Sequence, residues 1–402
     1  MKRPGLGLWL AMGIFALLGV IFLAVSAYDF IAHLDRQVHA ITCSFVPGLG
    51  APDTSGASGC HAVMMSPYSA VLRTWTWGGI PIALPGMAVF LYLLFRVADI
   101  WARQAEQDAH ETRFLLLATL LPLFASLVYF AISTFVVGSI CKLCIGTYVA
   151  SIGVFVCALV AHRRATASGP LPWGRYMLLF GEGVAFAAVP VLLYLSLKPA
   201  SAVATCGDLM HPEDKAGVRL KLGTNPGGAP AIEVLDPLCP ACKGLDQRLA
   251  ASGFKDRLNL ELALFPLDKE CNWMVSESVH PGACMVSEAV LCAGDQVPQV
   301  LAWIFDHQQE LRELGARDPG QLAARIRTDL PQIAGCLGKP EIKARLNRSL
   351  RWAVSNSLPV LTPQVFVRNQ KICPEDSDLG LDYVLSRVLA GGATAARPAG
   401  GR

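Results

Sequence analysis

The stretch Cys141-Lys142-Leu143-Cys144-Ile145-Gly146-Thr147-Tyr148 sets two cysteines at the junction of two long apolar segments. Phe114–Ile140 precedes it and Leu143–Ala161 continues it. Each segment is long enough to span a bilayer, which takes about 17–25 residues. Side chains three positions apart share one face of a helix, so the two sulfurs can form a disulfide or bind a metal. The stretch predicts a reactive thiol pair at a membrane boundary, with two inert buried cysteines as the alternative.

Three further stretches are apolar enough to cross a membrane, namely Leu6–Tyr28, Thr74–Phe95 and Tyr176–Leu197. The last contains Glu182, which we expect to face the bundle or an end of the span, because an ionisable group in lipid is costly. Only 16% of the residues are charged, against roughly 25% in soluble proteins. The sequence therefore predicts a membrane all-α bundle with a four-helix core and a fifth transmembrane helix.

Positive charges are distributed unevenly between the loops. Most basic residues near the spans fall on one side, namely Lys2, Arg3, Arg96, Arg103, Arg113, Arg163, Arg164 and Arg175. The first loop, Asp29–Arg73, and the turn at Lys142 carry fewer. The positive-inside rule therefore puts the N-terminus in the cytoplasm and everything after Lys198 outside. A signal peptide cleaved near Ala27 is the alternative for the first span and leaves this orientation unchanged.

The chain has 13 cysteines, and this count suits an oxidising compartment, because cytosolic thiols stay reduced. The odd number leaves at least one thiol unpaired within the chain. Cys43 and Cys60 in the first loop lie on the same predicted membrane face as Cys141 and Cys144. A structural loop disulfide is the alternative for the first two. Cys157, deep in the fourth span, fits an inert thiol.

From about Ala200 charges return and apolar runs shorten, which indicates a soluble domain. A strand candidate, Ala231–Asp236, leads into Cys239-Pro240-Ala241-Cys242 and a helical stretch to about Ala251. This order is the thioredoxin arrangement. The helix dipole favours Cys239 as the attacking thiolate, and Cys242 is expected to be the buried resolving thiol. Zinc is the competing interpretation of two Cys-x-x-Cys motifs. We expect no metal, because one motif lies in a membrane span.

The remaining cysteines suggest structural disulfides. Cys271 and Cys284 flank a loop containing His280-Pro281-Gly282 and are predicted to pair. Four cysteines are then left and allow three pairings, one of which joins Cys292 to Cys336 and Cys206 to Cys373. The segment Met285–Arg351 is expected to be mostly helical.

The N-terminal part resembles bacterial vitamin K epoxide reductase homologues over roughly residues 7–165. The resemblance is carried by Cys60-His61-Ala62-Val63 with Ser66-Pro67-Tyr68, by Gly79-Ile80-Pro81 with Gly86, and by Cys141 and Cys144 followed by Tyr148. It implies a quinone, ubiquinone or menaquinone, bound inside the bundle against Cys144, with Tyr148 and Ser66 lining the pocket. Cys141 would exchange with the loop cysteines. From spacing alone, Tyr148 is equally well an ordinary packing residue.

The C-terminal part resembles thioredoxin-like disulfide oxidants over about residues 217–392. That family carries a cis-proline beside its active cysteines. Pro363, which follows Leu361-Thr362 and precedes the apolar strand candidate Gln364–Arg368, matches that residue. The long helical segment is similar to the helical insertion of periplasmic disulfide oxidants.

These features predict an α/β thioredoxin-like domain with a helical insertion behind the membrane bundle. The expected divisions are a quinone-binding bundle at 1–165, a cytoplasmic loop and fifth helix at 166–200, a linker at 201–216, a periplasmic domain at 217–392 and a disordered tail at 393–402. The expected location is the bacterial inner membrane.

The expected activity is disulfide formation in reduced secreted proteins. Electrons would pass from Cys239–Cys242 through Cys43–Cys60 to Cys141–Cys144 and then to the membrane quinone pool. One alternative reverses the flow and makes the chain a disulfide reductase or isomerase. Another is a membrane-anchored chaperone whose cysteines are all structural. The net charge of +3 and the lack of a basic aromatic patch argue against a nucleic-acid partner.

Overall fold

A computed structural model of the chain describes residues 5–34, 59–166, 173–197, 204–223, 225, 227–373, 376–391 and 395–396. Cys43 and the N-terminal Lys2 and Arg3 lie outside the described residues. The chain divides into two compact units, Met1–Ala200 and Ser201–Arg402. Each is described by itself below as unit 1 and unit 2.

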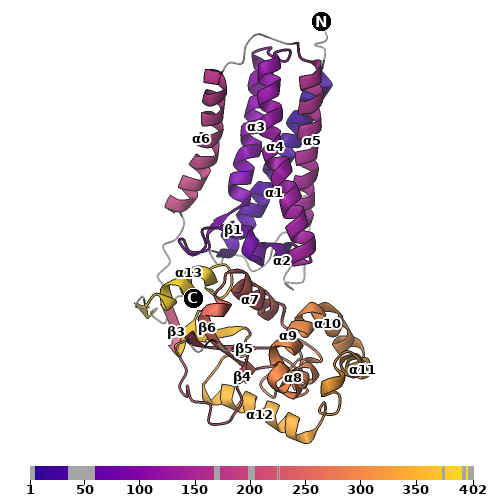
Figure 1. Ribbon diagram of the computed structural model, residues 1–402, viewed down its shortest axis with the longest axis vertical. Coiled ribbons are helices and arrows are strands. Elements are labelled where there is room, and N and C mark those ends of the chain that lie inside the picture. The colour runs from indigo at the N-terminus through magenta and orange to yellow at the C-terminus, as the bar shows by residue number, and fades with distance from the viewer. Residues whose placement is uncertain are drawn as a thin grey trace. The chain divides into compact units, whose positions relative to one another are not determined.

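Unit 1 is a bundle of long apolar helices (Figure 1). Among the described residues, five are long and apolar enough to cross a membrane. They are α1 (Leu6–Leu34), α3 (Ala83–Ala102), α4 (Ala109–Ala131) with its continuation to Val137, α5 (Lys142–Arg164) and α6 (Trp173–Leu197). Helix α1 packs against α3 and α5, α4 packs against α3 and α5, and α6 packs against α3. The predicted four-helix core and additional fifth helix are confirmed.

Several span boundaries differ from the prediction, among them the start of the second span and the end of the first. The second span begins at Ala83 and not at Thr74, because Gly78 and Gly79 have positive φ angles of 72° and 76° and turn the chain. That turn joins the short antiparallel strands β1 (Ala70–Val71) and β2 (Ile80–Pro81). Helix α1 continues to Leu34, because Phe30 and Leu34 extend its buried face. Asp29, assigned to the first loop from the sequence, is therefore a buried residue of α1.

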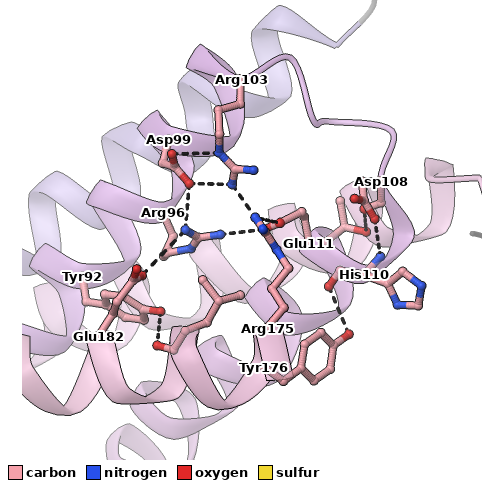
Figure 2. Close-up of polar contacts among 12 residues, drawn as sticks. Tyr92, Arg96, Asp99, Arg103, Asp108, His110, Glu111, Arg175, Tyr176 and Glu182 are labelled. Carbon is pink, nitrogen blue, oxygen red and sulfur yellow. Dashed lines mark hydrogen bonds and ion pairs between the residues drawn. The ribbon is translucent and has the colours of Figure 1, made fainter. Parts of the chain in front are cut away.

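A cluster of charged side chains fastens α6 to the bundle (Figure 2). Arg96 on α3 and Glu111 on α4 are both buried, and their side chains lie 2.5 Å apart. Arg175 on α6 pairs with the same carboxylate. Glu182 lies 4.0 Å from Arg96, so it faces the bundle as expected. Because removing one partner from a buried ion pair is strongly destabilising, the cluster fixes the place of α6 on α3 and α4.

Unit 2 is built on a mixed sheet with helices packed on it (Figure 1). Within the described residues the strand order is β4 (Leu220–Lys221), β6 (Leu258–Leu264), β5 (Ala229–Leu235), β7 (Gln364–Val367), β8 (Gln370–Ile372), β3 (Ala204–Asp208) and β9 (Ala395–Ala396). Strand β5 is parallel to β6 and antiparallel to β7. The helices are α7 (Pro240–Ala251), α8 (Ala283–Cys292), α9 (Val297–Asp306), α10 (Gln308–Arg317), α11 (Pro319–Asp329), α12 (Pro340–Ser355) and α13 (Leu381–Leu389).

Strand β5 divides the core of unit 2 into two layers. Ile232 and Val234 pack with Phe366 and Trp352 on one face. Leu235 packs with α7 on the other. Side chains alternate along a strand, so Glu233 falls on the face that carries α7. The helical expectation for Met285–Arg351 and the strand expectations near 231 and 364 are confirmed.

Two expected boundaries of the soluble part are wrong. Ala204–Asp208, placed in the linker 201–216, forms β3 and pairs with β8. Cys206 within it is bonded to Cys373, 167 residues away. Ala395–Ala396, placed in the disordered tail, pairs with β3 as β9. Both segments gain their order from partners distant in the sequence, and their local composition carries no strand signal.

Candidate functional site

The first candidate site lies where α5 begins. Cys141 is the N-cap residue of α5 and has extended backbone angles, and Cys144 follows one helical turn later. Cys141 is buried and Cys144 is half-buried, and both are free thiols. The two side chains are joined by a sulfur hydrogen bond. The helix start thus carries two reduced sulfurs in contact, as the spacing predicted.

A short helix, α2 (Gly59–Met65), brings Cys60 to the same place. The Cys60 sulfur lies 3.0 Å from that of Cys141. Cys60 is itself disulfide-bonded, and its predicted partner Cys43 lies outside the described residues. Gly59 makes this approach possible, because a Cβ at that position would overlap the carbonyl oxygen of Ile140. A disulfide sulfur and a free thiol are therefore held in contact, which is the arrangement that thiol–disulfide exchange needs.

An apolar cavity of about 370 Å³ opens beside these sulfurs. It is lined by Cys60, Cys141, Cys144 and Tyr148, together with Ser66. Tyr148 is hydrogen-bonded to Cys144. The Ser66 hydroxyl donates to the Val63 carbonyl at 2.7 Å, so in this arrangement it can only accept a further hydrogen bond. All predicted residues of this site that the structure describes line one cavity.

Among the polar lining residues that the sequence prediction missed are Asp29 and Tyr129. Asp29, buried in α1, is the one carboxylate among the described residues that line the cavity, and Tyr129 on α4 adds a phenol besides those of Tyr68 and Tyr148. The sequence around Tyr129 gave no indication that it lines a cavity, because an aromatic residue in a span usually faces lipid or packs against other helices. Asp29 could have been noticed as an acid that follows an apolar run directly, had the first span been extended.

The second candidate site lies in unit 2, at the start of α7. Cys239 is the N-cap of that helix, Pro240 occupies its first turn, and Cys242 is completely buried. A hydrogen bond from Cys242 is the largest cause that lowers the pKa of Cys239, which falls to about 6. Burial raises the pKa of Cys242 well above its usual value. Cys239 is therefore the thiolate at neutral pH and Cys242 the protonated thiol, as the sequence predicted.

The turn around Cys239 is held from two directions. The Thr362–Pro363 peptide is cis, as expected by resemblance, and the Cys239 sulfur lies 3.6 Å from the Thr362 carbonyl oxygen. The Gln308 side chain on α10 donates to the carbonyl oxygens of Pro237 and Cys239, at 3.0 and 3.1 Å. The turn that presents Cys239 is thus fixed by the helical insertion and by the strand that follows Pro363.

Glu233 is a second buried acid that the sequence did not single out. It lies on β5 facing α7, and neither carboxyl oxygen has a hydrogen-bond partner among the described residues. Burial raises the pKa of Glu233 to about 8. A negative charge here raises the pKa of Cys242 in turn. At neutral pH this acid is therefore protonated, next to the buried thiol.

Three disulfides brace unit 2 outside the redox pair. Cys271 is bonded to Cys284, Cys292 to Cys336 and Cys206 to Cys373. The predicted pairing of Cys271 with Cys284 is confirmed. Of the three pairings left open for the other four cysteines, the structure has Cys292 with Cys336 and Cys206 with Cys373. Cys157 is free and buried in α5, as expected of an inert thiol. Across the described residues, no three His, Cys, Asp or Glu side chains gather as a metal site would require.

In the comparisons with known proteins, the family match falls within unit 1. Residues 10–159 match the model of the Vitamin K epoxide reductase family. No curated protein matches the chain. Among solved structures, reduced DsbA1 from Neisseria meningitidis is 18% identical over 44% of this chain and 96% of that chain, with a TM-score of 0.31. The oxidoreductase DsbA from Xylella fastidiosa is 17% identical over 45% of this chain and 100% of that chain, with a TM-score of 0.30.

Proposed function

We propose that this chain, whose residues 10–159 carry a vitamin K epoxide reductase family domain ahead of a thioredoxin-like unit, forms disulfide bonds in secreted proteins and passes the electrons to a membrane quinone. The chain is a multi-pass membrane oxidoreductase. The bacterial inner membrane, with the N-terminus in the cytoplasm and unit 2 outside, is part of the proposal. It is supported by the excess of basic residues on one side of the spans.

The observation that carries the proposal is the 3.0 Å contact between the sulfurs of Cys60 and Cys141. One sulfur belongs to a disulfide and the other to the thiol pair that lines the cavity. Thiol–disulfide exchange proceeds by attack of a thiolate along the disulfide axis and conserves the number of disulfides. Two electrons can therefore move between the loop and α5 with little movement of either sulfur.

The relay begins at Cys239. A substrate thiolate attacks Cys239 of the oxidised Cys239–Cys242 pair and releases Cys242. The second substrate thiol then attacks the substrate sulfur of this mixed disulfide and releases Cys239. The products are the substrate disulfide and reduced Cys239 and Cys242. The Cys239 thiolate attacks Cys43 and releases the Cys60 thiolate, and Cys242 resolves the mixed disulfide. Cys60 then attacks Cys141 of an oxidised Cys141–Cys144 pair and releases Cys144. Cys43 then attacks the Cys60 sulfur of this mixed disulfide, which releases the Cys141 thiolate and restores the Cys43–Cys60 disulfide.

The cavity of unit 1 fits an aromatic electron acceptor by size and chemistry. Its lining is mostly apolar, and the phenols of Tyr129 and Tyr148 can donate hydrogen bonds to ring carbonyls. A bound quinone takes up two electrons and two protons, which balances the oxidation of Cys141 and Cys144 to a disulfide. Cys144 and Tyr148 are the residues we expect at the ring. Ser66 is expected at the rim as an acceptor, because its hydroxyl hydrogen is already donated.

The test uses the full chain purified in detergent, a reduced unfolded test protein and a short-chain ubiquinone. We expect the test protein to lose two thiols for each quinone that is reduced. Cys144→Ala should abolish both reactions, and Cys239→Ala should abolish oxidation of the test protein. Cys157→Ala is the matched control, because it removes a buried thiol from the same helix, and it should behave like the unaltered chain.

Two outcomes would overturn the proposal. Quinone reduction that survives Cys144→Ala would remove the terminal step. Cys239–Cys242 found mainly reduced in growing cells would favour the reversed flow, in which unit 2 is a reductase or isomerase. The low pKa of Cys239 argues for the oxidising direction, because a stabilised thiolate favours the reduced form of the pair and makes its disulfide a stronger oxidant.

A further inference from the structure

A buried carboxylate lies next to the reactive thiol of unit 2. Asp236 is completely buried three residues before Cys239, and its backbone carbonyl accepts the Cys239 N–H at 3.0 Å. One side-chain oxygen accepts the Leu238 N–H at 2.8 Å, and the other accepts the Leu267 N–H at 2.8 Å. Asp236 therefore holds the turn that presents Cys239, but its negative charge opposes a thiolate there.

His280, when protonated, supplies a cation at this carboxylate. Its Nδ1 lies 2.8 Å from the Asp236 oxygen that binds Leu267, and the ring is buried. The dipeptide between the two motif cysteines, Pro240-Ala241, has no ionisable side chain. A side-chain cation that compensates the Asp236 charge therefore comes from outside the motif, and His280 is the histidine hydrogen-bonded to Asp236.

The loop that carries His280 is fastened at both ends. The Cys271–Cys284 disulfide closes it. The buried Asp268 accepts hydrogen bonds from the Gly282 N–H at 2.9 Å and from the Ser278 hydroxyl at 2.7 Å. The His280 N–H also donates to the Leu267 carbonyl at 3.1 Å. The imidazole is thus held against Asp236 by a rigid support.

We propose that His280, held by Asp236, is a positioning residue whose positive charge stabilises the Cys239 thiolate from outside the Cys-x-x-Cys motif. The charged groups that act on His280 are Asp236 on the β5–α7 turn, Cys239 at the start of α7 and Arg312 on α10. The charges that act on Cys239 are those of Asp236 and His280, and the Cys242 thiol and Thr362 act on it through hydrogen bonds. Glu233 acts on Cys242 from β5.

The titration of these groups agrees with the geometry. Burial is the largest influence on the pKa of His280 and lowers it, but the hydrogen bond and charge of Asp236 and the charge of Cys239 raise it overall. Cys239 and His280 each favour the charged form of the other. The coupling is reciprocal, so whatever His280 does to the pKa of Cys239, the Cys239 thiolate does to the pKa of His280.

The first experiment compares two redox forms of the unaltered chain. The full chain in detergent, labelled at histidine, is titrated by NMR in its reduced and disulfide forms, and the His280 signal is assigned by its loss in His280→Asn. We expect the His280 pKa to be higher in the reduced form by about half a unit or more, because only that form has the thiolate. Equal pKa values in the two forms would overturn the proposal.

The second experiment measures the thiolate directly. Alkylation of Cys239 by iodoacetamide is followed against pH by mass spectrometry of its peptide, so neither the quinone nor the direction of electron flow enters the result. His280→Asn keeps a donor at the Nδ1 position and removes the charge. It should raise the midpoint and slow alkylation at pH 6 by about threefold to tenfold. His211→Asn, an exposed histidine of the same unit, should leave both unchanged. A folded His280→Asn chain with an unaltered midpoint would show that His280 is merely structural.

Discussion

At the scale of single residues, the buried Glu233 makes the stability of unit 2 depend on pH. In the folded chain its pKa is raised to about 8 by burial, from 4.5 in an exposed carboxyl. Between these values the folded state holds a proton that the unfolded chain has lost. The contribution of this protonated carboxyl to the free energy of unfolding is therefore fully present below pH 4.5 and is lost as the pH rises to about 8. The loss is on the order of 3–5 kcal/mol, because one pKa unit corresponds to about 1.4 kcal/mol.

The substitution Glu233→Gln should flatten this dependence. An amide stays neutral at every pH, so any cost of burying it is constant and the contribution of position 233 to the slope disappears. The measurement is denaturant unfolding of the oxidised full chain in detergent from pH 5 to 8.5, read by protease cleavage within unit 2. The oxidised form is used because its motif cysteines do not titrate. Glu277→Gln, at an exposed position, should keep the original slope, and an equally steep slope in Glu233→Gln would contradict the assignment.

The residues that the sequence predicted are those whose signal is local. Cys141, Cys144, Cys239 and Cys242 stand out because their spacing within one helical turn is itself the chemical requirement. Gly59 is different, because its role comes from the carbonyl oxygen of Ile140, 81 positions further along. Asp29, Glu233 and His280 likewise act through neighbours that only the folded chain brings to them. Spacing in one sequence carries no information about such contacts.

At the scale of elements, the apolar helices were predictable and the short helix α2 was not. Membrane spans can be identified in a sequence by their length and lack of charge, and all five were predicted, with errors only at their ends. Helix α2 has seven residues, too few to be stable alone. It is held by its packing on α5 and on the end of α4. That packing places Cys60 beside Cys141, so the functionally decisive element is the one with the weakest sequence signal.

The close approach of α2 depends on Gly59, and Gly59→Ala should disturb it. The added methyl group overlaps the Ile140 carbonyl, so α2 must move away and the sulfurs of Cys60 and Cys141 must separate. In a chain that also carries Cys43→Ala and Cys144→Ala, these two thiols are free to cross-link. We expect mild oxidation to form the Cys60–Cys141 bond at least about threefold more slowly with Gly59→Ala, because disulfide formation tolerates little change in sulfur separation.

The matched control for this experiment is Gly174→Ala on α6, where nothing lies within 4 Å of an added Cβ. It should leave the cross-linking rate unaltered. Peptide mass spectrometry without reductant gives the yield of the Cys60–Cys141 bond in each chain. An unchanged rate in Gly59→Ala would mean that α2 finds the same contact without a glycine.

At the scale of the whole molecule, one chain carries a pair of free thiols in each of its two units. Unit 1 has a thiol pair beside an apolar cavity, and unit 2 has a thiolate of low pKa. A covalent link between two modules raises their effective concentration to about the millimolar range when the connection lets them meet. The division at Ala200 was predicted from the return of charges, whereas the membership of residues 204–208 in the sheet depends on a strand and a cysteine more than 160 positions away.

Transfer within one chain makes a prediction about dilution. Cys242→Ala removes the resolving thiol, so a Cys239 thiolate that attacks the loop should remain there as a Cys239–Cys43 mixed disulfide. Because the attack is intramolecular, the rate at which this species appears should stay constant over a hundredfold dilution of the purified chain, whereas a reaction between two molecules would slow in proportion. Non-reducing peptide mass spectrometry identifies the linked peptides, and chains with Cys239→Ala added should give none. Mixed disulfides that form only at high protein concentration would mean that unit 2 serves the membrane domain of another molecule, and the fusion would then act by recruitment and not by direct transfer.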